Sequence, residues 1–422
     1  MSSRIELVAP DPTDVIQGHS FREKCLTSVA VSWGLCAFFP IGVIYLNLLL
    51  MLTALAFAPD WMQRVQKMQQ APVVLPIVLM VTWTLLAAAV GDWFPDTATR
   101  LFHVFRVALV LCIGLMLTPD EAQKALAGFL LAAIFAALLV SAHHIWGMPD
   151  WAIWNGLLSS RNNFSSGNMI TLATACGVYC CLGIRKDSRH EDRWPALGAG
   201  LALSIVVSLH AVSRNSQLLL VLLLMTAVLC RFRSLRAAIF GLAVVVTLAG
   251  SMWQFSSRTQ SRFHELVANL QAAAVGSSYA TSGGVRWRMY QEAAQGMAEH
   301  PVFGMGVGSW LPHWRTVWLE LEKDGSPAVQ RQFSEINNPH DDFLLAGMET
   351  GVPGMLILIW LVARFVRTGW RQGSAAGSVT VVIGASVFTT ALINAPFRDA
   401  AFGMTLLWLL AVSVAAHGEV KR

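Results

Sequence analysis

Long apolar segments separated by short polar ones run through almost the whole chain. A segment of about 20 apolar residues is long enough to cross a bilayer as a helix. Windows of about 19 residues predict apolar helices near residues 25–39, 41–58, 71–91, 99–118, 122–142, 167–184, 196–213, 215–230, 237–254, 343–366, 377–395 and 399–416. The first two are joined at Phe39-Pro40, where proline favours a turn between two helices over the middle of one span. The pattern predicts an all-α, polytopic membrane protein with about twelve transmembrane helices, or eleven if the first two form one span.

The composition agrees with this pattern. Apolar residues make up 55% of the chain and charged residues only 13%, against about 25% charged residues in an average soluble domain. An ordinary soluble enzyme is thereby excluded. The cysteines lie in or at the edges of apolar segments, so neither a disulfide framework nor a cysteine-based zinc site is predicted. Residues 1–24 lack the pattern of a signal peptide.

Basic residues set the predicted orientation, because cytoplasmic loops carry an excess of Lys and Arg. Four basic clusters and the C-terminal pair fall in alternate loops, which predicts that these loops and both termini are cytoplasmic: Arg64/Lys67, Arg185–Arg193, Arg231–Arg236, Arg364–Arg371 and Lys421-Arg422. The remaining loops then face outward. We predict three parts: residues 1–255 with transmembrane helices 1–9, an outer loop domain 256–340, and residues 341–422 with helices 10–12.

The outer segment of about 85 residues is too long for a plain connection, and we expect it to contain short helices. Arg286–Glu299 has the pattern of an amphipathic helix, which the glycine-rich stretch His300–Trp310 cannot continue. At about 100° per residue, Arg286 and Arg288 point about 200° apart, so only one of them is expected to face a site. Arg286 shares a face with Tyr290, whereas Arg288 could lie on the solvated face.

Arginines on the outer side run against the charge bias and need another explanation. Arg161, Arg214 and Arg398 lie near outward helix ends and Arg106 lies within a span, which makes them candidates for one anion site. Alternatively, each reaches lipid phosphates or pairs with Asp96, Asp150 or Asp399. Arg161 and Arg214 are the stronger candidates because serines and asparagines surround them. Guanidinium groups bind phosphate without a metal, so neither a metal nor a cofactor is expected; the pair His143-His144 is read as interfacial.

His340 is the most informative single residue. It follows Asn338-Pro339, which we expect to be the cap and first position of the next helix. A histidine there can take a proton from a hydroxyl group, and Asp341 or Asp342 could orient it or serve as the base instead. The alternative is a histidine that only bonds to loop carbonyls. Glu349, beside Gly351 and Gly354, is read as a packing or hinge residue, so a double displacement through a second carboxylate is disfavoured.

Two motifs in order resemble one family. Gly284, Arg286, Tyr290, His300, Pro301, Gly304 and Gly306 follow the pattern Gly-x-Arg-x(3)-aromatic-x(9)-His-Pro-x-x-Gly-x-Gly. His340, Gly351 and Gly354 are then spaced as in a signature of bacterial O-antigen ligases. The chain thus resembles the O-antigen ligase and polymerase superfamily of GT-C type membrane glycosyltransferases. It departs from the signature at Asp341, where the ligases usually have an amide or a serine.

The resemblance implies that Arg214 and Arg286 bind the diphosphate of a polyprenyl-linked glycan and that His340 activates the acceptor hydroxyl. The charge argument adds Arg161 as a diphosphate-binding candidate, and Arg288 remains one because either arginine of the amphipathic helix could face the site. Asp341, Asn338 and Tyr290 are expected around them.

The implied reaction is a metal-independent, inverting transfer of O-antigen from undecaprenyl diphosphate to a sugar hydroxyl of lipid A-core. It would take place at the periplasmic face of the bacterial inner membrane. The expected partners are these two substrates and membrane lipids, without nucleic acid. Alternatives within the superfamily are an O-antigen polymerase or a protein O-oligosaccharyltransferase. A transporter of lipid-linked glycans is an alternative of a different class, although the polar residues gather at one face and not at the midplane, where a transporter binds its substrate.

Overall fold

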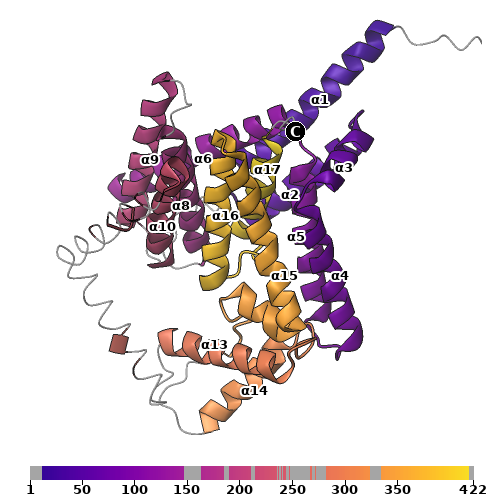
Figure 1. Cartoon of the computed structure of the whole chain (residues 1–422), viewed down its shortest axis with the longest axis vertical. Coiled ribbons are helices and arrows are strands. Elements are labelled where there is room, and N and C mark those ends of the chain that lie inside the picture. The colour runs from indigo at the N-terminus through magenta and orange to yellow at the C-terminus, as the bar shows by residue number, and fades with distance from the viewer. Residues whose placement is uncertain are drawn as a thin grey trace, which may run out of the picture.

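The computed structural model (Figure 1) describes residues 12–146, 163–184, 190–210, 214–234, 282–323 and 334–417, with a few positions between 236 and 271. All regular secondary structure in these residues is helical. The helices are α1 (Pro12–Leu35), α2 (Ile41–Ala56), α3 (Trp61–Gln70), α4 (Val74–Val90), α5 (Thr97–Leu115), α6 (Pro119–Trp146), α8 (Asn163–Gly183), α9 (His190–His210), α10 (Arg214–Phe232), α13 (Ser282–Glu299), α14 (Trp310–Lys323), α15 (Asp342–Gln372), α16 (Ala375–Ile393) and α17 (Phe402–Ala415).

The helices confirm the all-α, polytopic class. Every predicted apolar segment except 237–254, which lies largely outside the described residues, coincides with one of them. In the described part of the chain, five helices are long and apolar enough to cross a membrane, or up to six if the bent pair α2 and α3 is one span. Helices α4 and α17 are apolar but shorter. The chain is therefore a multi-pass membrane protein, while the count of twelve spans stays a prediction, as does the division at residues 255 and 340.

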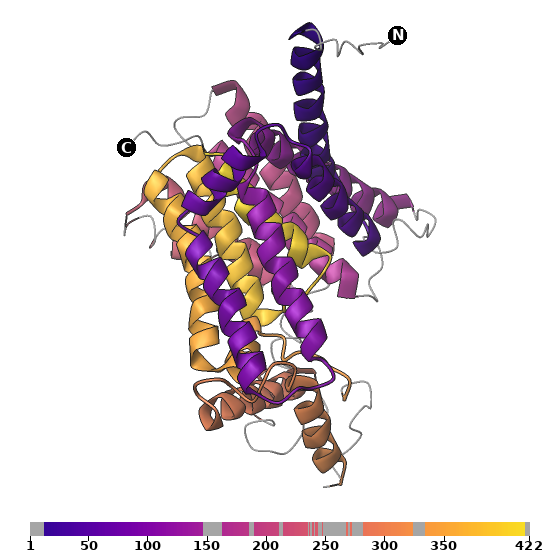
Figure 2. The same cartoon turned by 90° about the vertical axis from the view of Figure 1, so that its right-hand side faces the viewer.

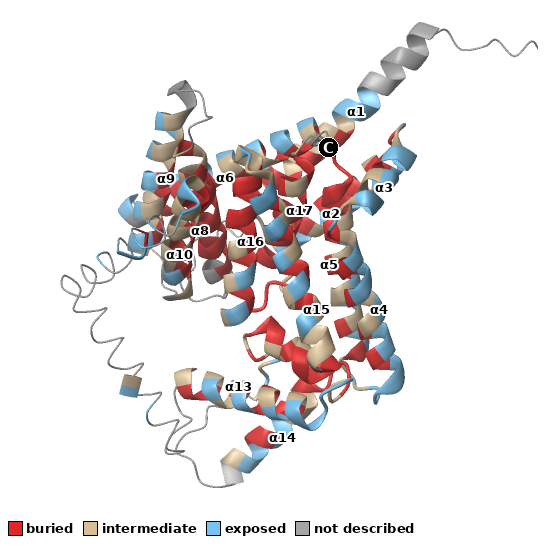
Figure 3. Ribbon diagram, viewed as in Figure 1, coloured by how far each residue is buried: buried red, intermediate tan, exposed pale blue. Residues whose placement is uncertain are grey.

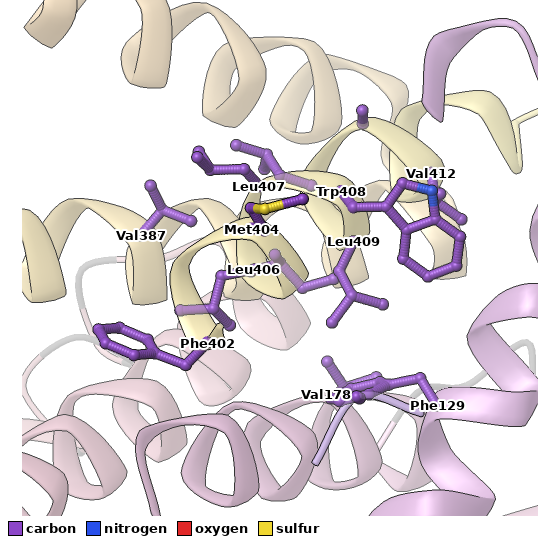
Figure 4. Packing of buried hydrophobic residues seen from close by; sticks show 14 of the residues in the cluster. Phe129, Val178, Val387, Phe402, Met404, Leu406, Leu407, Trp408, Leu409 and Val412 are labelled. Atoms are coloured by element: carbon purple, nitrogen blue, oxygen red, sulfur yellow. The ribbon is translucent and has the colours of Figure 1, made fainter. Parts of the chain in front are cut away.

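Helix α17 forms the centre of the bundle. Every one of its residues except Val414 is buried, and a helix that is apolar on all sides needs neighbours on all sides. Figure 4 shows its side chains facing Val387 of α16, Phe129 of α6 and Val178 of α8. Trp408 also stacks on Trp33 of α1, with ring centroids 4.9 Å apart. Buried residues consequently run through the middle of the bundle, along α16 and α17 (Figure 3).

Helices α13 and α14 cap one end of the bundle. The start of α1 and the end of α17 lie at the opposite end, as Figures 1 and 2 show. The predicted amphipathic helix is confirmed as α13, which begins four residues earlier than expected, at Ser282. Helix α14 packs on it through Trp310 and Trp314, which are buried in one cluster with Val285 and Met289 of α13. The two tryptophans also stack on each other within α14, with centroids 5.7 Å apart.

The glycine-rich turn after α13 docks on a kink in α15. Gly351 leaves the helical conformation with φ 77° and ψ 176°, and a Cβ there would lie 2.1 Å from the carbonyl oxygen of Val302. Gly304 has φ +70°, and its Cβ would lie 2.4 Å from the carbonyl oxygen of Met348. Backbone hydrogen bonds join the two segments, from Met305 N to Met348 O at 2.7 Å and from Val352 N to Pro301 O at 2.8 Å. The motif glycines are thus needed because two backbones meet here.

The charge pattern predicts that Arg64 lies in a loop, but it lies on the short helix α3 and is buried. Its cytoplasmic side stays a prediction. Its Nη1 and Nη2 donate to the carboxylate of Glu121 on α6 at 2.7 and 2.9 Å, and its Nε donates to Asp60 at 2.6 Å. The Lys67 ammonium donates to the carbonyl oxygen of Leu117 at 2.8 Å. Helix α3 packs against the bundle because this brings Arg64 to the carboxylates of Asp60 and Glu121 and Lys67 to a backbone carbonyl oxygen.

Replacing Arg64 by alanine should destabilise the protein by about 3–5 kcal/mol, because it leaves the Glu121 carboxylate buried without its partner. The midpoint of thermal unfolding of the purified protein in detergent measures this loss. Lys124→Ala is the matched control, since Lys124 and Asp120 form an exposed pair, and such pairs contribute little. Equal midpoints for the two variants would contradict the assignment.

Candidate functional site

The site begins at the first turn of α15. Asp341, in extended conformation, caps the helix: its Oδ1 accepts from the backbone N–H groups of Phe343 and Leu344, both at 2.9 Å. The expectation that Asn338-Pro339 cap the helix is therefore wrong by three residues. Asn338 instead forms a turn, in which its side-chain oxygen accepts from the N–H of His340 at 2.8 Å. The Asp341 carboxylate is a favourable cap because it accepts from two N–H groups at the positive end of the helix.

His340 is held in a conformation that few residues adopt. Its φ is 57°, in the left-handed region that costs a residue other than glycine about 1–3 kcal/mol. The Asn338 turn before it and the Asp341 cap after it hold the backbone there. Such strain is typical of functional sites.

The surroundings of His340 keep its imidazole neutral. Burial lowers its pKa, and the positive charge of Arg286 on α13 lowers it further, to about 4, although a hydrogen bond with the side chain of Asn394 acts in the opposite direction. Asn394 directly follows α16. Three segments from separate parts of the sequence thus meet at this imidazole: α13, the loop before α15, and the end of α16.

Arg286 and Tyr290 occupy one face of α13, as their spacing predicts. Burial raises the pKa of Tyr290, the charge of Asp341 raises it further, and Arg286 lowers it. Burial also raises the pKa of Asp341 to about 6, although the two capping N–H groups act against this. Arg286, Tyr290, His340 and Asp341 therefore form one electrostatic cluster.

The first turn of α10, which begins at Arg214, reaches the same place. The side chain of Asn215 donates to the carbonyl oxygen of Ile393 at 3.3 Å, and Ile393 precedes Asn394, the hydrogen-bond partner of His340. The backbone position of Arg214 is thereby brought to the cluster, although its side chain is outside what the structure describes. Arg161 lies outside the described residues.

Arg288 points to a different partner. Its Nη2 pairs with Glu292 at 2.7 Å, and Glu292 also contacts Nε2 of His313 on α14 at 2.9 Å. Burial would raise the pKa of Glu292, but the hydrogen bond with His313 and the charge of Arg288 outweigh it, and the pKa lies below its ordinary value. Glu292 therefore links α13 to α14 through His313, and Arg288 pairs with it within α13. The part of Arg288 in binding a diphosphate stays a prediction. Of the two helix arginines, Arg286 is the one beside His340.

Comparison with known proteins bears on this arrangement. Residues 199–359 match the family model described as O-antigen ligase. This segment belongs to the O-antigen ligase family. Its members are membrane glycosyltransferase-like enzymes, ligases or polymerases. No curated protein matches the chain.

The O-antigen ligase segment contains Arg214, Arg286 and His340, but residues outside it complete the site. Arg100, at the start of α5, was not singled out from the sequence. Its Nε pairs with Glu349 of α15 at 2.8 Å, and both side chains are buried. Its Nη2 donates to the carbonyl oxygen of Asn337 at 2.8 Å, three residues before His340. Two opposite charges in two apolar segments were the available signal, because such charges pair inside a membrane.

Two of the arginines proposed for an anion site, Arg106 and Arg398, donate to backbone carbonyl oxygens in the loop after α16 and in the loop before α15, respectively. Arg106 donates to the carbonyl oxygens of Arg398 and Asp399 at 2.7 and 3.2 Å, and to the hydroxyl of Tyr45 at 3.1 Å. Arg398 donates to the carbonyl oxygen of Asn337. Neither guanidinium is therefore placed beside His340 by its hydrogen bonds, and both instead hold the backbone of the loops around the candidate site.

The Arg286→Gln variant should raise the pKa of His340 above 4 but leave it below 6.5, because the positive charge is lost while the burial remains. The pH dependence of carbethoxylation of His340 by diethyl pyrocarbonate, followed by peptide mass spectrometry, measures this. Arg288→Gln is the control, since Arg288 pairs with Glu292. An unchanged midpoint in Arg286→Gln would show that the two groups do not interact.

Proposed function

We propose that the protein is an O-antigen ligase that transfers O-antigen from undecaprenyl diphosphate to a sugar hydroxyl of lipid A-core. The observation that carries the proposal is the meeting of the α10 start, Arg286 and His340 at one end of the bundle. Transfer from a diphosphate donor needs cations at the leaving group and a proton acceptor beside them. Arg214 and Arg286 are the proposed cations, and His340 is the proposed proton acceptor.

The proposed transfer is a single inverting displacement. The acceptor oxygen attacks the anomeric carbon, the bond from that carbon to the diphosphate oxygen breaks, and His340 takes the hydroxyl proton. Negative charge grows on the departing diphosphate, and guanidinium groups fixed in place stabilise this charge more in the transition state than in the ground state. Arg214 and Arg286 have this role in the proposal, with Arg161 as a further candidate.

The low pKa of His340 fits this scheme. At about 4 in the free protein, the imidazole is neutral at physiological pH and ready to accept a proton, but it is a weak base. A bound diphosphate would neutralise Arg286 and so raise the pKa of His340 toward the range in which a general base is most effective. In the proposal, the donor thus strengthens the base that its own reaction needs.

The proposed location is the bacterial inner membrane. The α13–α14 end would face the periplasm, and both termini would face the cytoplasm. The α13–α14 end lies opposite the start of α1 and the end of α17 (Figure 2), which supports placing it and the termini on different sides of the membrane. The charge pattern of the loops supports the same orientation.

We expect Arg286→Ala and His340→Ala to lose transfer. Removal of one such charge-stabilising donor typically costs about 10² to 10³ in rate. The assay uses purified protein in detergent with lipid-linked O-antigen and lipid A-core, and it follows the linked product. Arg315→Ala is the matched control, since Arg315 is an arginine of the same end of the bundle that pairs with Glu335 on the surface. A wild-type rate for His340→Ala would exclude it as the base.

The lipopolysaccharide of a deletion strain separates a ligase from a polymerase. A ligase predicts core without attached chains and accumulation of lipid-linked polymer. Single repeats on the core would instead identify a polymerase and contradict the proposed acceptor.

A further inference from the structure

A pocket separate from the His340 cluster lies between α4, α5 and α15. Its volume is about 90 Å³, and since a water molecule needs about 10–15 Å³ on this measure, several water-sized groups fit inside. Met80, Val107 and Leu358 give it apolar walls, whereas Arg100, His103 and Arg398 line it with nitrogen atoms. Neither Arg286 nor His340 is among its lining residues.

The residues that line this pocket have two guanidinium N–H donor groups and one imidazole nitrogen that the described residues leave unused. Arg100 Nη1, His103 Nδ1 and Arg398 Nε are buried and have no hydrogen-bond partner in the described part of the chain. The Arg100 side chain is only 5% exposed. Buried donors are normally paired, because an unmade hydrogen bond costs the full desolvation of the group. Two guanidinium groups with unused N–H donors at one pocket favour an anionic occupant.

The two carboxylates that line the pocket already have partners. Glu349 accepts from Arg100 Nε at 2.8 Å and from the backbone N–H groups of Gly308 and Trp310. Asp342 accepts from the backbone N–H of Phe397 at 2.8 Å. Because these bonds use other atoms, Arg100 Nη1 and Arg398 Nε stay available to a ligand.

The helices around the pocket also carry the surface that lipid covers. Leu79 on α4, Phe105 on α5 and Leu356 on α15 are exposed apolar side chains, and α5 and α15 are among the candidate membrane spans. An occupant with an anionic head and an apolar tail fits both the guanidinium groups and this position at the bilayer.

We propose that this pocket binds the phosphate group of a membrane lipid, with Arg100 Nη1 and Arg398 Nε donating to its oxygens and the ester carbons against the apolar wall. Each of these hydrogen bonds joins a cationic donor to an anionic acceptor, and such bonds are stronger than those between neutral groups. The site goes beyond the proposed function and does not depend on it. The pocket is nevertheless connected to the His340 cluster, since Arg100 and Arg398 both donate to Asn337, three residues before His340.

Binding can be tested on the purified full-length protein by native mass spectrometry. The probe is dihexanoyl phosphatidic acid, compared with dihexanoylglycerol, which lacks the phosphate, and with inorganic phosphate, which lacks the lipid. Arg398→Gln removes one guanidinium while Arg100 still holds Asn337, and Ala346→Leu fills part of the pocket, which Ala346 lines. Arg315→Gln is the charge-matched control on the surface, and Arg286→Gln disables the proposed diphosphate site.

We expect one phosphatidic acid per chain, bound more tightly than either comparison ligand. Because a hydrogen bond to a charged group is involved, Arg398→Gln should weaken it about tenfold to a hundredfold. Ala346→Leu should also weaken it, whereas Arg315→Gln and Arg286→Gln should leave it unchanged. Equal binding of dihexanoylglycerol or inorganic phosphate, or unchanged binding in both pocket variants, would overturn the proposal. Loss of binding in Arg286→Gln would assign the lipid to the proposed diphosphate site beside His340 and would also overturn the pocket proposal. That result would not test glycan transfer.

Discussion

The buried ion pair between Arg100 and Glu349 determines where the segment before α15 lies. A single charge in this position would be costly in a membrane protein, and pairing removes most of that cost. The pair does more than neutralise itself, because Glu349 also accepts from the backbone of the glycine-rich turn and Arg100 also donates to Asn337. One interaction therefore connects α5, the turn after α13, the kinked α15 and the loop that carries His340.

This anchoring explains how a strained residue can be held at a site built from distant segments. The imidazole of His340 needs α13 for its electrostatic neighbour and α16 for its hydrogen-bond partner, and the first turn of α10 lies beside that partner. These segments are far apart in the sequence, so the short connections between neighbouring helices do not determine how they are arranged around His340. They share a position because Gly304 and Gly351 let the turn after α13 and the kinked α15 approach each other closely, and because the buried pair aligns α5 with α15.

The helices could be predicted from the sequence because their apolar segments are long and their ends are marked by polar residues. The amphipathic α13 and the turn after it were predicted for the same reason. The cap of α15 was not, because Asn338-Pro339 and Asp341 are both acceptable caps locally, and tertiary contacts such as the bond from Arg100 to Asn337 decide between them. The sequence also indicated Arg286, through its shared face with Tyr290, but not Asn394, whose importance depends only on where α16 ends in space. The ion pair joins residues 249 positions apart, a separation that no local pattern reveals.

The proposed reaction requires a lipid-linked diphosphate to bind beside His340, between α13 and the start of α10. The most direct test is an experimental structure of the protein with undecaprenyl diphosphate bound. The account predicts that the diphosphate contacts the guanidinium of Arg286 and lies next to the His340 imidazole, with Arg214 in reach. A diphosphate bound away from His340, against Arg288 on the outer face or in the pocket of Arg100, would contradict it.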